Sequence, residues 1–132
     1  MEGIVNDKIN LTFPAKGEYI SLARLTTSSV ASKEGFNIDD IEDLKVSIGE
    51  ACNIILENTS ISSEQNIVID YMVDVEALNI SIIARKENGL DISEINKEEN
   101  FSVMIIDSLM DDVELSSEGD CMSVNILKKK RL

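Results

Sequence analysis

Apolar and polar residues alternate over residues 8–13, where Ile9, Leu11 and Phe13 are separated by polar side chains. A period of two is typical of a strand with one buried face, and Pro14 predicts where this strand ends because it has no amide hydrogen to donate. Residues 17–35 change to a helical period, and Gly35 is expected to end that helix. Its predicted apolar stripe consists of Tyr19, Leu22, Thr26 and Val30.

A second helix is predicted up to Asn58, with Asn37 or Asp39 as its N-terminal cap. At about 100° per residue, one apolar face should point to the core. That face consists of Ile41, Leu44, Ile48, Ala51, Cys52 and Ile55. Glu50 and Ile54 share the opposite side, where an isoleucine is unexpected. Either a second layer of packing beneath residues 87–94 explains Ile54, or this side once lined a pocket.

The rest of the chain predicts two hairpins around a third helix. Residues 66–86 are rich in β-forming side chains and should turn near Glu76. Residues 86–100 are polar and contain Asn88 and Gly89, which predicts a loop. Residues 101–113 are apolar on all sides, as in a helix that is buried on more than one face. Residues 113–127 predict a last hairpin with its turn at 117–120, and the closing "KKKR" should be a solvated tail.

The predicted order is strand, helix, helix, strand, strand, helix, strand, strand. Helices mixed with hairpins in this way indicate an α+β fold, a two-layer sandwich of a sheet and helices. A length of 132 residues suits one domain, so residues 1–132 are treated as a single domain.

Composition narrows the function. The net charge of −13 argues against nucleic acid and against an anionic membrane surface as partners. The chain has no histidine, which excludes a histidine metal site and imidazole base catalysis; no metal site is expected. Cys52 and Cys121 do not form a secreted-type disulfide framework, and Cys52 should be a small buried thiol. Without a signal peptide or a membrane-spanning apolar run, a cytoplasmic location is expected.

Two segments resemble a known family. Residues 13–59, "FPAKGEYISLARLTTSSVASKEGFNIDDIEDLKVSIGEACNIILENT", and residues 108–117, "SLMDDVELSS", are similar to the anti-sigma serine kinases of the RsbW and SpoIIAB type. These kinases belong to the histidine-kinase-like (GHKL) ATPase superfamily. The resemblance covers nearly the whole chain in the order and length of its elements. It implies the Bergerat-type fold, a mixed, mainly antiparallel sheet with helices on one face.

The family's nucleotide site includes an E-x-x-x-N box on the second helix, where the glutamate activates the attacking group and the asparagine binds magnesium. The resemblance places Glu50 at the glutamate and Ile54 at the asparagine. Isoleucine has no oxygen with which to ligate a hard cation. Asn53 comes one residue early and should point about 100° away around the helix.

The family's D-x-G box also departs from its pattern. Its aspartate accepts a hydrogen bond from the adenine amino group, but that position falls at Arg85, with Glu87 at the glycine. An arginine side chain can only donate. A shifted register would instead pair Glu87 with Gly89, so this loss is open.

In the family, a G-x-G run at the start of the third helix cradles phosphates with bare backbone N–H groups. Here that run reads Asn100, Phe101, Ser102, Val103, without a glycine. The preceding segment, a long lid in the family, is short. Ile54, Phe101 and Val103 are therefore expected to fill part of the former nucleotide space.

The resemblance also assigns partner binding to the first helix, where a family arginine falls on Arg24. Arg24 should lie opposite the apolar stripe, beside short side chains such as Thr27 and Ser28, with room to dock against a partner carboxylate. A solvated arginine is the alternative. Family members dimerise near the first strand and first helix, so a homodimer is expected, and an exposed edge at residues 8–13 would permit it.

These observations predict an anti-sigma-factor-like protein that binds a sigma factor, an anti-anti-sigma protein of the STAS type, or both, and that needs no cofactor. One alternative is an active serine-protein kinase that uses ATP and magnesium, with Glu50 as its base. Another is a non-catalytic scaffold for a different signalling partner.

Overall fold

Five strands form one sheet in the order β1-β2-β3-β5-β4 in the computed structural model, which describes residues 7–58, 61–85 and 91–131. A mixed, mainly antiparallel sheet was expected. Every pairing between these strands is antiparallel, so the sheet is antiparallel throughout and not mixed. The strands are β1 (Asp7–Pro14), β2 (Asn66–Val73), β3 (Ala77–Arg85), β4 (Asp112–Glu118) and β5 (Cys121–Lys129).

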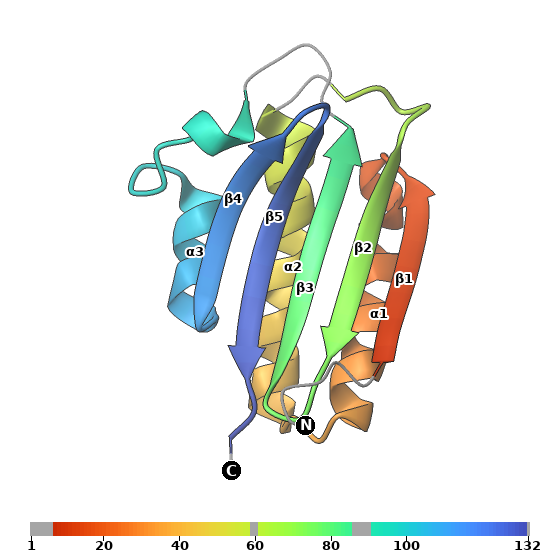
Figure 1. Ribbon diagram of the computed structural model, residues 1–132, viewed down its shortest axis with the longest axis vertical. Coiled ribbons are helices and arrows are strands. Elements are labelled where there is room, and N and C mark those ends of the chain that lie inside the picture. The colour runs from red at the N-terminus through yellow and green to blue at the C-terminus, as the bar shows by residue number, and fades with distance from the viewer. Residues whose placement is uncertain (1–6, 59–60, 86–90, 132) are drawn as a thin grey trace.

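Helices cover one face of this sheet (Figure 1). They are α1 (Ile20–Lys33), α2 (Ile38–Asn58) and α3 (Phe101–Leu109). Short 3-10 turns precede two of them, η1 (Gly17–Tyr19) before α1 and η2 (Ile92–Glu94) before α3. In Figure 1, α2 lies in the middle of the helical layer, with α1 on one side and α3 on the other. The predicted α+β two-layer sandwich is confirmed.

The core lies between the sheet and the helices. Alternate residues of the strands point into it, as Ile67, Ile69, Tyr71 and Val73 do in β2. The other sheet face carries polar contacts, for example from Ser81 Oγ to Asn125 Oδ1 at 2.8 Å. Since one face of each strand is apolar and the other largely polar, only one register can bury the apolar set. Within the described ranges no helix is long and apolar enough to cross a membrane.

Local signals placed most element ends correctly. Gly35 follows α1 with a φ of 84°, a left-handed conformation that favours glycine. Asn37 Oδ1 accepts the N–H of Asp40 at 2.8 Å, so Asn37 is the residue whose side chain caps α2. Asp74 Oδ1 accepts the N–H groups of Glu76 and Ala77, each at 2.8 Å, and this closes the turn predicted near Glu76.

The buried face of α1 differs from the predicted stripe. Leu22 is 45% exposed, whereas the small residues Ala23, Thr27, Val30 and Ala31 are buried. Small side chains let α1 approach the sheet and α2 closely, and this outweighs burial of a leucine. The apolar period therefore identified the helix and the buried Val30, but the buried face is turned away from Leu22 towards Ala23 and Thr27.

The third helix ends at Leu109, not at residue 113 as predicted. The N–H of Asp111 instead donates to Leu127 O at 3.0 Å, and Asp112 begins β4 opposite Leu127. Pairing with β5 thus replaces the last helical turn. A hydrophobic period cannot show this, because Val113 is buried in either conformation.

The basic C-terminal segment is not the solvated tail that was expected. Lys128 is only 5% exposed, and its Nζ lies 3.6 Å from Asp40 Oδ1. Arg131 Nη2 also lies 3.1 Å from that oxygen, and Lys130 Nζ pairs with Glu34 Oε1 at 3.0 Å. These pairs join the end of β5 to the end of α1 and the start of α2.

Candidate functional site

Glu50 is held by a side chain from α3. Ser102 Oγ donates a hydrogen bond to Glu50 Oε1 at 2.7 Å, and both residues are half-buried. Glu50 comes from the middle of α2 and Ser102 from the first turn of α3, so this bond joins the two helices directly. Ser102 stands at a position that the resemblance assigns to the family's phosphate-binding run. The glutamate carboxylate therefore already has a partner within the chain.

Ile54 is fully buried and belongs to the main core. It lies one helical turn after Glu50, on the side of α2 that packs against α3. Val103 of α3 is 1% exposed and belongs to the same core. Ile54 is therefore explained by packing, as one of the two explanations expected, but it packs in the main core and not in a separate second layer.

The N-terminus of α3 is capped by its own sequence. Asn100 Oδ1 accepts the N–H of Val103 at 3.0 Å, so this amide already has an acceptor. Phe101 is 78% exposed. It points into solvent, so the expectation that Phe101 fills part of the nucleotide space is wrong, whereas Ile54 and Val103 are both buried in the core.

The segment before α3 is tied to the body of the protein. Ile92, in η2, is fully buried and belongs to the core, and η2 contacts α2, β4 and β5. Asp91 Oδ1 accepts the N–H of Ser93 at 3.0 Å. Over its described part, residues 91–100, this segment is therefore anchored to the core by Ile92.

The positions that the resemblance assigns to the family's D-x-G box are only partly described by the structure. Arg85 is exposed at the end of β3, where its Nη2 lies 3.9 Å from Asp120 Oδ2 across the hairpin end. Glu87 and Gly89, the register alternative, lie outside the described residues. Among the residues that the structure describes, no three His, Cys, Asp or Glu side chains gather into a possible metal site.

A small hollow of about 210 Å³ connects Glu50 with Arg24 across the α1–α2 contact. It is lined by Ile20, Arg24, Lys45, Val46, Gly49, Glu50 and Asn53. Gly49 lies below the aliphatic stem of Arg24, since a β-carbon there would be 3.7 Å from Arg24 Cδ. Two cations, Arg24 and Lys45, thus lie close together on a strongly acidic protein. This volume is below the roughly 300 Å³ of the smallest typical ligand pockets.

Arg24 is exposed, as expected, but its predicted neighbours are not all on the surface. Thr27 is fully buried: its Oγ1 donates to Ala23 O at 2.8 Å and lies 2.7 Å from the Tyr71 hydroxyl oxygen. Its assignment to the docking surface is therefore wrong, because its hydroxyl joins α1 to β2. Ser28 is half-buried. Leu25, which the sequence analysis did not select, is 66% exposed next to Arg24.

Two buried acidic groups are unsuited to chemistry at neutral pH. Cys52 is buried, as expected, and burial raises the pKa of its thiol to about 12. Burial also raises the pKa of Tyr71 to about 12, against the smaller opposing effect of its hydrogen bond with Thr27. Both groups stay neutral and serve packing.

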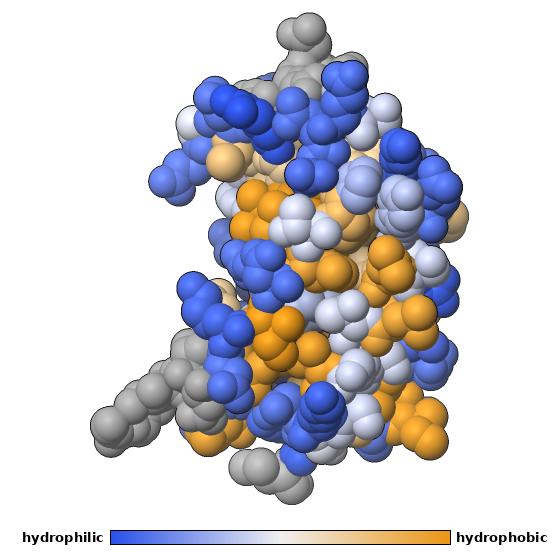
Figure 2. All heavy atoms as spheres, turned by 90° about the vertical axis from the view of Figure 1, so that its right-hand side faces the viewer, coloured by the Kyte–Doolittle hydropathy of each residue, from blue (hydrophilic) through white to orange (hydrophobic). Residues whose placement is uncertain are grey.

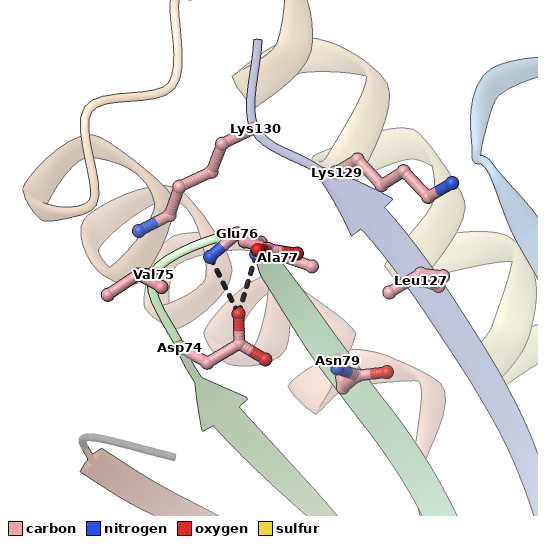
Figure 3. Close-up of a pocket in the computed structure, with 8 residues that line it drawn as sticks. All are labelled: Asp74, Val75, Glu76, Ala77, Asn79, Leu127, Lys129 and Lys130. Carbon is pink, nitrogen blue, oxygen red and sulfur yellow. Dashed lines mark hydrogen bonds between the residues drawn. The ribbon is translucent and has the colours of Figure 1, made fainter. Parts of the chain in front are cut away.

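A wider hollow of about 880 Å³ lies at the β2–β3 turn and the end of β5 (Figure 3). Two of its polar side chains, Asp74 and Lys130, are engaged in structural contacts. Asp74 accepts the two turn amides drawn in Figure 3, and Lys130 pairs with Glu34. Because this hollow contains none of the selected site residues, it is not the candidate site.

Comparisons with known proteins cover most of the chain. Residues 13–128 match the family described as histidine kinase-like ATPase domain. The serine-protein kinase RsbW of Bacillus thuringiensis subsp. konkukian (strain 97-27) is 33% identical over 123 residues, covering 83% of this chain and 77% of that protein. The RsbW of Bacillus mycoides (strain KBAB4) is 31% identical over 126 residues, with coverage of 83% and 77%.

The fold also matches a solved structure. A crystal structure of the RsbU and RsbW domains of a Mycobacterium tuberculosis protein superposes with a TM-score of 0.73. The match covers 96% of this chain and 34% of that longer chain, at 14% sequence identity. At this identity the likeness concerns the fold alone.

Proposed function

The chain belongs to the RsbW-type anti-sigma factor and serine kinase group of the histidine kinase-like ATPase family, and from this premise we propose that it works by binding proteins without ordinary binding of Mg-ATP. Its partners are a sigma factor, an anti-anti-sigma protein of the STAS type, or both. In this proposal residues 1–132 act as one cytoplasmic domain that blocks its partner by surface contact.

One contact carries this proposal: the 2.7 Å bond from Ser102 to Glu50, which closes the α2–α3 contact. The residues present there do not fit magnesium or a triphosphate. Ile54 supplies no oxygen and is buried, and the Val103 amide is already bonded to Asn100. A phosphate would have to displace the Asn100 cap and would meet side chains where the family has glycines.

Titration of the full chain with ATP and magnesium is expected to produce no saturable heat in calorimetry. The physical reason is that binding would have to break the Glu50–Ser102 bond and the Asn100 cap without gaining a metal ligand at position 54. An active RsbW kinase titrated in parallel is the positive control, and circular dichroism checks that the sample is folded. Saturable binding, or phosphate transfer to a STAS protein, would restore the kinase alternative with Glu50 as its base.

The partner surface in this proposal is the exposed side of α1. Arg24 is placed over Gly49 next to Lys45, and Leu25 adds exposed apolar area beside it. A planar cation with apolar neighbours suits docking against a carboxylate and an apolar side chain of a partner. Figure 2 shows apolar side chains distributed over this side of the molecule, along α1 and the free edge of β1.

Self-association is proposed on the same side, because β1 is an edge strand and Ile9 and Leu22 are 38% and 45% exposed. An unpaired edge with adjoining apolar residues is a suitable surface for a second copy. In this arrangement each copy would present its Arg24 near the common interface.

The Arg24→Glu variant is expected to weaken binding of the sigma factor or STAS partner by about a hundredfold, since it replaces a cation by a like charge opposite a partner carboxylate. The measurement is size-exclusion chromatography with light scattering, and calorimetry, on the chain co-expressed with sigma factors and STAS proteins of its source genome. The same light-scattering trace gives the mass of the free protein and so tests the dimer.

Lys129→Glu is the matched control, because Lys129 is an exposed cation on the sheet rather than on α1. It should leave partner binding unchanged. Equal affinities of the Arg24→Glu variant and the unaltered protein would show that α1 is not the docking surface. The absence of any complex with sigma factors and STAS proteins would favour the scaffold alternative.

A further inference from the structure

The outer face of α3 is apolar but uncovered. Of its nine residues, Val103 and Ile106 are buried in the core. Phe101 is 78% exposed and Met104 45% exposed, and Ile105 is half-buried beside them. At about 100° per residue, Phe101, Met104 and Ile105 lie on one face of the helix. The sequence predicted a helix buried on more than one face, but within the described residues the protein covers only the inner one.

A hollow continues this face towards the sheet. Its volume is about 450 Å³, and its lining includes Met104, Val103 and Val113. Figure 1 shows α3 at the outer edge of the helical layer, next to β4 and with α2 on its other side. An apolar helix face that adjoins a hollow lined by both apolar and charged side chains has the features of a groove for an amphipathic helix.

Two carboxylates lie beside this face. Glu98 and Asp107 line the hollow, and Glu94, Glu99 and Asp111 are exposed nearby in the sequence. The one cation in the lining, Lys97, directs its Nζ to Val113 O at 3.4 Å. A chain with a net charge of −13 adds to the negative potential. A second copy would bring like charges together, and an anionic membrane would be repelled.

We propose that this α3 face, formed by Phe101, Met104, Ile105, Glu98 and Asp107, binds a cationic amphipathic helix of a protein partner. The apolar side chains of that helix contact Phe101 and Met104 and enter the hollow, and its lysines or arginines lie opposite Glu98 and Asp107. This surface is separate from the Arg24 side of α1, since α2 lies between the two helices. The inference thus goes beyond the proposed function and does not depend on a sigma factor.

The test uses isotope-labelled full chain and a fluorescent peptide of about 18 residues, long enough to form a helix, with leucines at helical spacing and lysines on both flanks. Saturable binding is expected in fluorescence anisotropy, with amide shifts confined to α3, η2 and the start of β4. Phe101→Ser and Asp107→Lys should each weaken binding by about tenfold or more. Raising the salt from about 50 to 300 mM should weaken it further.

Ile38→Ser is the matched control, because Ile38 is also 78% exposed but lies at the start of α2. It should bind the peptide as the unaltered protein does, and an acidic peptide with the same leucines should not bind.

Three results would overturn the proposal: no saturable binding of the cationic peptide, equal loss in Ile38→Ser, or amide shifts away from α3. Phe101-dependent binding to phosphatidylcholine vesicles in place of the peptide, or Phe101-dependent dimerisation, would assign the face to a lipid or to a second copy. The experiment contains neither sigma factor nor nucleotide, so its failure would leave the proposed function untouched.

Discussion

The Asp40→Asn variant is expected to unfold with a free energy about 3–5 kcal/mol lower than that of the unaltered protein, because it leaves a buried charge without its counter-ion. Asp40 is 2% exposed and Lys128 is 5% exposed. Among the partners that the described residues offer, Lys128 Nζ would keep the carbonyl oxygen of Leu109, at 3.0 Å. Urea denaturation followed by circular dichroism measures the change.

Two further variants separate this ion pair from other effects. Asp39→Asn removes an exposed carboxylate from the same helical turn and should cost no more than about 1 kcal/mol, the size of a helix-dipole effect. Asp40→Asn combined with Lys128→Met removes both charges and should recover most of the loss. If the Asp40→Asn and Asp39→Asn variants had equal free energies of unfolding, the ion pairs of Asp40 with the basic C-terminal segment would not stabilise the fold.

The Ile54→Asn variant restores the family's asparagine four residues after Glu50, yet it is expected to lose stability and to gain no affinity for Mg-ATP. Ile54 is fully buried, so the change removes apolar contacts and buries an amide without a designed partner. These two effects together should lower the free energy of unfolding by about 3–5 kcal/mol. Chemical denaturation and ATP calorimetry measure the two outcomes separately.

The control is Ile54→Val, which keeps the site apolar and should cost about 0.5–1.5 kcal/mol. Nucleotide affinity should stay absent in both variants, because Asn100 still caps α3 and Ser102 still holds Glu50. An Ile54→Asn protein that is as stable as the original, or one that binds Mg-ATP, would show that the side of α2 facing α3 is an open pocket.

The candidate site was only partly visible in the sequence. The spacing from Glu50 to Ile54 and the absence of glycine at residues 100–103 pointed to the α2–α3 contact without any coordinates. The bond between Glu50 and Ser102 could not be foreseen, because 52 positions separate the two residues and a hydrogen bond has no local pattern. Leu25 was also missed. An apolar period in α1 indicates which residues face the core, but it does not indicate which exposed apolar residue contacts a partner.

The helices and strands and most of their ends follow from the sequence, because these depend on neighbours along the chain. Alternation predicted β1, and β-forming residues on either side of a turn predicted the hairpins. Gly35, Asn37 and Asp74 act within a few residues of their own position. The family resemblance added the fold and the positions to inspect.

Tertiary structure alone decided which faces are covered and which charges are paired. It buried Thr27 and left Leu22 exposed, because helices that pack closely have room for small side chains between them but not for large ones. It brought Lys128 beside Asp40, although the sequence shows only a basic end. It also left Phe101 in solvent, because α3 has the core on one side only. Burial and ion pairing depend on the whole packed arrangement, and no local period contains that information.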